Sequence, residues 1–143
     1  LGKRTGIKPG SEMKAAICLA NEMNIRISLI DQPIHITIKK LTSQITGKEK
    51  LTFLKEFLKA LFLKNKQLDF DLNKVPSNKI IEKLIQDTKE RYPTVYKILI
   101  KERNTYMAKN LYKLMTKHPK EKILAVVGAG HEKDIIGEIK SIS

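Results

Sequence analysis

The sequence predicts an α/β fold that contains more helix than strand. Short runs of β-branched and apolar residues at about 26–30 and 122–127 are typical of two strands of one small sheet. Elsewhere apolar residues recur every three or four positions, which indicates amphipathic helices. The chain has 143 residues, 41% of them hydrophobic, enough for one ordinary core. We therefore expect residues 1–143 to form one domain or part of one.

Most of the chain between and around these strands is expected to be helical. Pro9, Gly10 and Ser11 combine a helix breaker with a good N-cap residue. Residues 34–41 alternate like a strand, but their apolar side chains also share one helical face, and a helix is the expectation. The expected helices cover about 12–23, 34–41, 51–62, 80–85, a long stretch from Pro93 to near His118, and a last segment from Ile135.

The charge balance favours a solvated basic surface over a specific nucleic-acid site. Lys and Arg number 28 against 15 Asp and Glu, a net charge of +13, which attracts anionic partners. The basic residues are mostly scattered lysines, and aromatic residues make up only 6%. The single cysteine, Cys18, excludes an intrachain disulfide and is expected in the core. No apolar run is long enough to span a membrane, so a soluble piece is expected.

The sharpest local motif follows the second expected strand. Gly128-Ala129-Gly130 is a tight turn, and His131 precedes the last helix. At the carboxyl edge of a sheet this turn would present the imidazole of His131 over a cleft, where open α/β folds bind ligands. His35 and His118 lack such a setting. The full G-x-G-x-x-G spacing of a dinucleotide site is missing, which excludes a Rossmann assignment.

Other polar residues do not stand out on spacing alone. Glu12 could simply favour the positive amino end of its helix, and Asp31 could cap the next element. Glu102, Arg103 and Asn104 lie in the long helix in a stretch that is typical of a solvated face.

Four segments of this chain, in order, contain P-G-S-E-M-x-x-A, L-I-D-x-x-I-x-x-T, E-R-N-x-Y-M-A and V-V-G-A-G-H, at residues 9–16, 29–37, 102–108 and 126–131. Together they resemble the TraB/pheromone-shutdown family. Two positions depart from the pattern: Gln32 stands where many relatives have Arg, and Asn104 where TraB members often have Asp. The resemblance implies an EreA/ChaN-like fold, of which residues 1–143 would be the carboxy-terminal part.

The same family is similar to the TIKI and GumN-like proteins, which share two G-x-x-H motifs. Residues 128–131 match the second motif, so the first is expected before Leu1 and the chain is expected to be truncated. The resemblance implies a divalent metal, Mn, Co or Zn, held in part by His131, with a bound water that attacks a peptide carbonyl. Without the first motif, we expect this chain alone to bind metal weakly and to be catalytically silent.

The resemblance also implies roles for the other matched residues. Glu12 or Glu102 would be a metal ligand or general base, and Arg103 would stabilise the oxyanion or orient a carboxylate. Asp31 would bind His131 without contacting the metal ion. Asn104 is also a candidate site residue, although it offers one possible ligand charge fewer than the Asp of many relatives. We expect Glu102 and Arg103 to face His131, and Asp31 to share its site.

Three function classes stay open at this point. The first is a metal-dependent peptide hydrolase that degrades or sequesters small peptides. The second is a non-catalytic peptide-binding or regulatory module. The full-length protein would be cytoplasmic or held at a membrane by segments outside this chain. Both classes are compatible with an oligomer. The third, nucleic-acid binding, depends only on the net charge, and a steep loss of affinity with salt would identify it.

Overall fold

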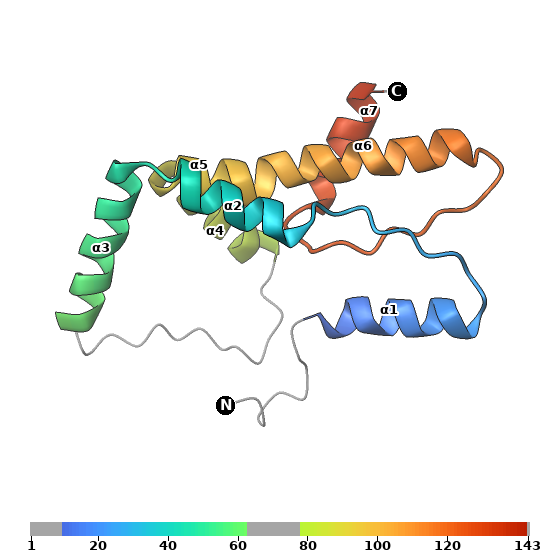
Figure 1. Cartoon of the computed structure of the whole chain (residues 1–143), viewed down its shortest axis with the longest axis horizontal. Helices are drawn as coiled ribbons and strands as arrows, with labels where there is room; N and C mark the ends of the chain where they lie inside the picture. Colours follow the sequence, from blue (N-terminus) through green and yellow to red (C-terminus); the bar gives the residue numbers. More distant parts are fainter. Residues whose placement is uncertain (1–9, 63–77, 143) are drawn as a thin grey trace. The chain divides into compact units, whose positions relative to one another are not determined.

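The computed structural model describes residues 10–62 and 78–142, and every regular element within them is a helix. The elements in chain order are α1 (Ser11–Glu22), α2 (Ile34–Gln44), α3 (Gly47–Phe62), α4 (Asn78–Arg91), α5 (Pro93–Tyr96), the π-helical turn η1 (Lys97–Lys101), α6 (Glu102–Lys117) and α7 (Glu132–Ile142). Figure 1 shows these helices with their labels. The predicted α/β fold is therefore wrong for the described part of the chain.

The two predicted strands, at 26–30 and 122–127, are coil without a β-ladder. Their composition suits a strand, but an isolated strand leaves its backbone N–H and C=O groups unpaired and is not stable without a neighbour. Within residues 10–62 and 78–142 no second strand supplies that pairing. Both segments cross their unit as irregular chain in Figure 1, and the expected sheet edge below His131 does not form.

The helix predictions fared better, because helical hydrogen bonds are local. The helices expected at 12–23, 34–41, 51–62 and 80–85 are α1 to α4, and the break before Pro93 is present. At the start of α1 the cap residue is Gly10, with a left-handed φ of 80°, instead of Ser11. Cys18 is exposed, so its expected place in the core is wrong.

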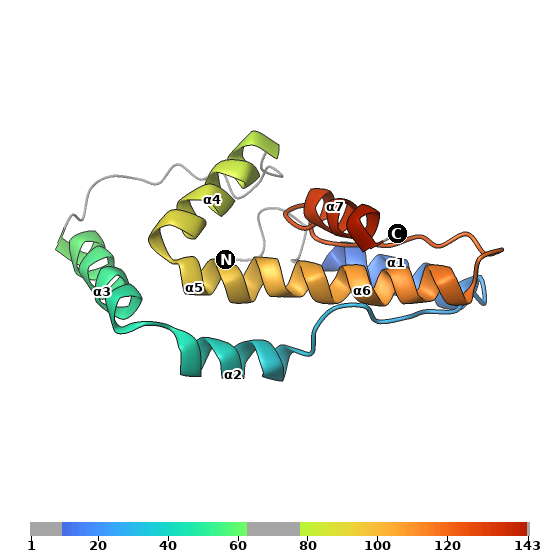
Figure 2. The ribbon, with the colours of Figure 1, turned by 90° about the horizontal axis from the view of Figure 1, so that it is seen from above.

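The described residues fall into two compact units, and each has its own small core. The first unit holds residues 10–31 and 104–142. Its core consists of Met107 and Ala108 on α6 and Ile135 on α7, with Ile30 and Val127 from the two coil segments packed against it. Figures 1 and 2 show α7 lying against this part of α6.

The second unit holds residues 32–62 and 78–103. In it α2 packs against η1 and α5, and α4 packs against α5. Ile98 of η1 is fully buried, and Thr37 of α2 is buried with its hydroxyl accepting a 2.9 Å hydrogen bond from the side chain of Gln32. Gln32, the residue that replaces the family's Arg, therefore serves as a local structural contact at the start of α2.

One carboxylate organises the helix ends of the second unit. Glu49 accepts hydrogen bonds from the backbone N–H and hydroxyl of Thr46, at 3.0 and 2.8 Å, while its own N–H donates to the Thr46 hydroxyl at 3.2 Å. This reciprocal pair is a capping box at the amino end of α3. The other oxygen of Glu49 accepts the backbone N–H of Thr94 in α5, at 2.7 Å. Glu49 thus caps α3 and α5 together.

No helix in the described parts of the chain is both long and apolar enough to cross a membrane.

Candidate functional site

His131 lies directly before Glu132, the first residue of α7. Its backbone N–H donates to the carbonyl of Gly128, at 2.9 Å, and its carbonyl accepts the N–H of Ile135, at 3.0 Å. A Cβ placed on Gly128 would lie 3.4 Å from Cδ2 of the imidazole, so the ring lies in van der Waals distance of the turn. The predicted tight turn before His131 is therefore present, although it follows coil instead of a strand.

The imidazole of His131 is held by the side chain of Asn104, which extends from α6. Nδ1 of His131 is 2.6 Å from Oδ1 of Asn104, and Asn104 is only 1% exposed. An amide oxygen can only accept, so the proton of this short hydrogen bond belongs to Nδ1. The neutral ring then carries its lone pair on Nε2.

Asn104 is oriented in turn by Asp134 on the first turn of α7. Nδ2 of Asn104 donates to Oδ2 of Asp134 at 2.9 Å. A carboxylate accepts and does not donate, so the NH₂ group must face Asp134 and the amide oxygen must face His131. The chain of contacts Asp134–Asn104–His131, here called the relay, thus fixes both the amide and the imidazole.

The relay sits at the end of the apolar stripe of α6. Asn104, Met107, Ala108 and Leu111 follow the spacing of one helical face, and Met107 and Ala108 form the core with α7. Beside the relay, the hydroxyl of Thr105 donates to Glu138 of α7, at 2.8 Å. Two neighbouring residues of α6 therefore each bind a carboxylate of α7, and these carboxylates are four residues apart on one face.

Asp134 is the residue that the sequence analysis missed. An acidic residue in the first turn of a helix is common because it favours the helix amino end, so Asp134 looks ordinary in the sequence. The available signal was its spacing, three residues after His131, which returns the side chain to the same side of the helix start.

The other first-unit candidates lie on the surface. Glu12 is exposed in the first turn of α1, and Asp31 is exposed at the end of the coil segment after α1. The amide of Asn110 on α6 donates to the carbonyl of Ile30, at 3.1 Å, and so holds the residue before Asp31 against the helix. The roles expected for Glu12 and Asp31 stay predictions.

Glu102 and Arg103 belong to the second unit. Glu102 binds Lys40 of α2 at 2.6 Å and lies 3.8 Å from the ammonium of Lys97. Arg103 donates to the carbonyl of Leu99 at 3.2 Å. Consecutive helical residues point about 100° apart, so the matched residues 102–104 leave α6 in different directions. That Glu102 and Arg103 face His131 stays a prediction.

A metal ion would find one nitrogen ligand in the relay. Residues 10–62 and 78–142 contain no group of three or more His, Cys, Asp or Glu side chains arranged to hold a metal ion. The donor chemistry at His131 nevertheless fits such an ion, because a ligating imidazole needs its lone pair on one nitrogen and a hydrogen-bond acceptor behind the other.

Comparison with known proteins supplies the family. Residues 3–137 match the TraB/PrgY/gumN family, almost the whole chain. The chain belongs to this family. It is also 41% identical over 143 residues to an uncharacterized protein of Methanocaldococcus jannaschii, covering 99% of this chain and 35% of that protein. This TraB-family chain thus spans about a third of that relative's length, and no solved structure matches it.

The family match confirms the resemblance seen in the four sequence segments. The matched range includes every candidate residue, from Glu12 in α1 to His131 before α7. Family membership was therefore predictable from the order of short motifs, even though the fold class drawn from the same segments was wrong.

Proposed function

We propose that this TraB-family chain takes part in metal-dependent hydrolysis of small peptides, with His131 as a nitrogen ligand for a divalent ion such as Mn²⁺, Co²⁺ or Zn²⁺. The observation that supports this role is the 2.6 Å contact between Nδ1 of His131 and the buried amide oxygen of Asn104. It leaves Nε2 as the lone-pair nitrogen, the form in which an imidazole binds a metal ion. When bound, the ion would act as a Lewis acid toward a peptide carbonyl or water.

The residues around His131 prepare the ring before any ligand arrives. Asn104 is buried, and α6 and α7 pack directly below it through Met107, Ala108 and Ile135. A ring that is already oriented loses little rotational freedom on binding. Glu12, Asp31, Glu102 and Arg103 are proposed to add ligand, base or peptide-orienting groups in the full-length protein.

Metal binding is the direct test. Calorimetric titration of the full-length protein with Mn²⁺, Co²⁺ and Zn²⁺ should show saturable binding, and His131→Ala should weaken it by at least about 100-fold. His118→Ala is the matched control, since His118 binds Glu121 and takes no part in the relay. Unchanged affinity in His131→Ala would contradict the proposal.

Peptide hydrolysis is measured on the same proteins by mass spectrometry of a random peptide library. The full-length protein should cleave peptides, and His131→Ala should abolish cleavage while leaving the helical circular dichroism signal unchanged. Peptides that are retained intact, with metal present, would instead support the non-catalytic binding module and reject the hydrolase.

A further inference from the structure

We propose that Asp134 is a positioning residue that sets the tautomer of His131 through Asn104. Asp134 accepts a hydrogen bond from Asn104, and Asn104 binds the imidazole, so the amide transmits the effect of Asp134 to the ring. The importance of this tautomer for metal binding depends on the proposed function, but the tautomer itself is a property of the chain alone.

The amide of Asn104 is the element that can switch. Rotating it by 180° exchanges Oδ1 and Nδ2 with almost no change in shape, and would present an N–H to Nδ1 of His131. Nδ1 would then have to accept, the proton would move to Nε2, and the ring would offer no lone pair there. The geometry of the backbone does not choose between these two arrangements.

Asp134 determines which of the two amide orientations of Asn104 is stable. Its carboxylate oxygen, 2.9 Å from Nδ2 of Asn104, has no proton to give, so the rotated amide would bring two acceptor oxygens together. Because Asn104 is 1% exposed, water cannot readily relieve that clash on the amide side. The carboxylate of Asp134 therefore fixes the orientation of the Asn104 amide, and the amide fixes the tautomer of the His131 ring.

The neighbouring contact between α6 and α7 allows the positioning role to be separated from a structural one. Thr105 and Glu138 also join the two helices, at 2.8 Å, one residue further along α6, and Thr105 is not part of the relay. Thr105→Val removes this contact while preserving side-chain shape. If Asp134 merely held the helices together, Asp134→Ala and Thr105→Val would act alike on His131.

The test is ¹⁵N nuclear magnetic resonance of the metal-free chain, labelled at histidine, at about pH 8.5, two units above the ordinary histidine pKa of about 6.5. His131→Ala assigns the signal. The unmodified chain should show a protonated Nδ1. In Asp134→Ala the ratio of Nδ1–H to Nε2–H tautomer should fall about tenfold, the factor for one hydrogen bond to a charged group. Asp134→Asn permits both amide orientations and should give an intermediate ratio.

Thr105→Val should leave the ratio unchanged, as should Glu132→Ala, which removes the other acidic residue of the first turn of α7. An unchanged ratio in both Asp134 variants, with helical content retained, would overturn the inference, as would a protonated Nε2 in the unmodified chain. A tautomer shift without metal binding by the full-length protein would reject only the proposed function. Metal binding without a tautomer shift would reject only the role of Asp134.

Discussion

At the scale of single residues, an amide at position 104 suits its surroundings better than a carboxylate. Asn104 accepts from His131 with one atom and donates to Asp134 with the other. A carboxylate could still accept the hydrogen bond from His131 but could not donate one to Asp134. The family pattern that resembles this segment often has Asp there, so the identity of this residue and the presence of Asp134 have to be considered together.

Asn104→Asp should therefore destabilise the chain at pH 7 by about 1–3 kcal/mol, because a buried donor is replaced by a second carboxylate facing Asp134. Near pH 5 the penalty should shrink, since two neighbouring carboxylates can share one proton. Urea unfolding at both pH values measures this. Asp134→Asn in the same chain should restore most of the loss. A stability at pH 7 equal to that of the unmodified chain would contradict the account.

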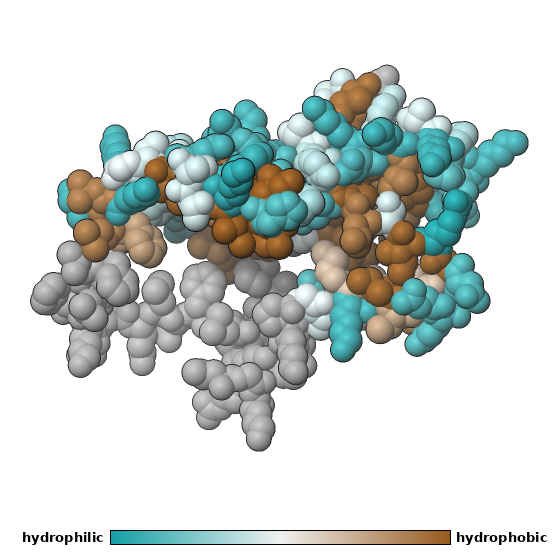
Figure 3. Space-filling view, in the orientation of Figure 1, coloured by the Kyte–Doolittle hydropathy of each residue, from teal (hydrophilic) through white to brown (hydrophobic). Residues whose placement is uncertain are grey.

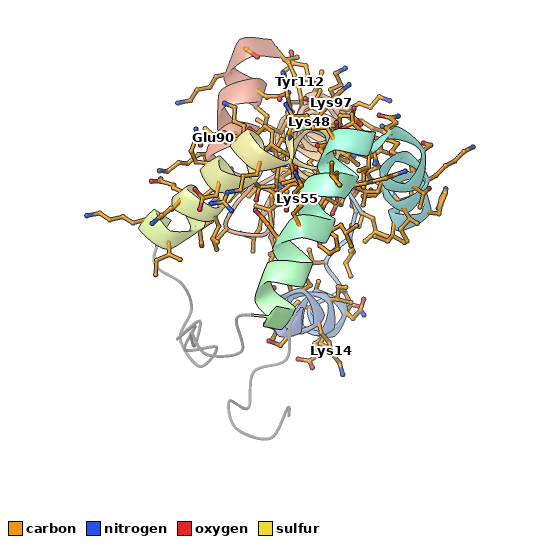
Figure 4. The ribbon with its side chains drawn as sticks, turned by 90° about the vertical axis from the view of Figure 1, so that its left-hand side faces the viewer. Lys14, Lys48, Lys55, Glu90, Lys97 and Tyr112 are labelled. Carbon is orange, nitrogen blue, oxygen red and sulfur yellow. The ribbon has the colours of Figure 1, made fainter. Side chains whose placement is uncertain are left out.

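At the scale of helices, Glu49 connects two helix ends that are far apart in sequence. Burial raises the pKa of its carboxyl, but hydrogen bonds from the backbone and side chain of Thr46 and from Thr94 outweigh burial, and the pKa falls from 4.5 to about 2. The ionised form is the one that caps α3 and α5. Figure 4 shows Lys48 and Lys55 projecting from α3, on the helix that this carboxylate begins.

Glu49→Gln should lower the free energy of unfolding by about 1–2 kcal/mol at pH 7, the usual value of a helix cap. Because the folded pKa is depressed, the stabilisation is fully present above about pH 4.5 and is lost as the pH falls through about 2. The difference between the two proteins should therefore vanish in acid. Thermal unfolding followed by circular dichroism between pH 7 and 2 measures it.

Glu90→Gln is the control for that series. Glu90 is exposed on α4 (Figure 4) and accepts a hydrogen bond from Gln86, one turn away. Its replacement should change stability by less than about 0.5 kcal/mol at any pH. A constant difference between Glu49→Gln and the unmodified chain across the whole pH range would show that the ionised cap is not the cause.

At the scale of the whole chain, much apolar surface faces solvent. Leu29 and Leu124, in the two coil segments of the first unit, are 87% and 89% exposed, and Ile25 and Ile27 are also exposed. Hydrophobic side chains appear at the surface in Figure 3. Apolar side chains that face solvent promote association between molecules.

We expect the 143-residue chain to self-associate with rising concentration. The double change Leu29→Ser and Leu124→Ser should shift it toward monomer without changing its helical signal, because neither side chain contributes to the core. Analytical ultracentrifugation and dye binding measure this. Leu111→Ser, which alters a side chain packed against the core, should instead destabilise the first unit by at least about 2 kcal/mol. Unchanged association in the double variant would contradict the expectation.

Features that depend on residues close together in the sequence were predictable, and features that depend on distant residues were not. Helices α1 to α4 were predictable because their apolar spacing and breakers are local. The strands at 26–30 and 122–127 were not, because a strand depends on a partner that residue composition does not reveal. His131 was found through the glycine turn before it and Asn104 through the family motifs, whereas Asp134 has a role only through the packing of α7 on α6.

The π-helical turn at Lys97–Lys101 has a consequence for chain length. A π turn accommodates one residue more than the α-helical turn it replaces. Deleting a single residue here would restore a regular helix and leave the residues on either side nearly in their present orientation, so Glu102 would stay on the side of Lys40. A one-residue deletion between Lys97 and Lys101 should therefore preserve this ion pair, although it shortens the chain.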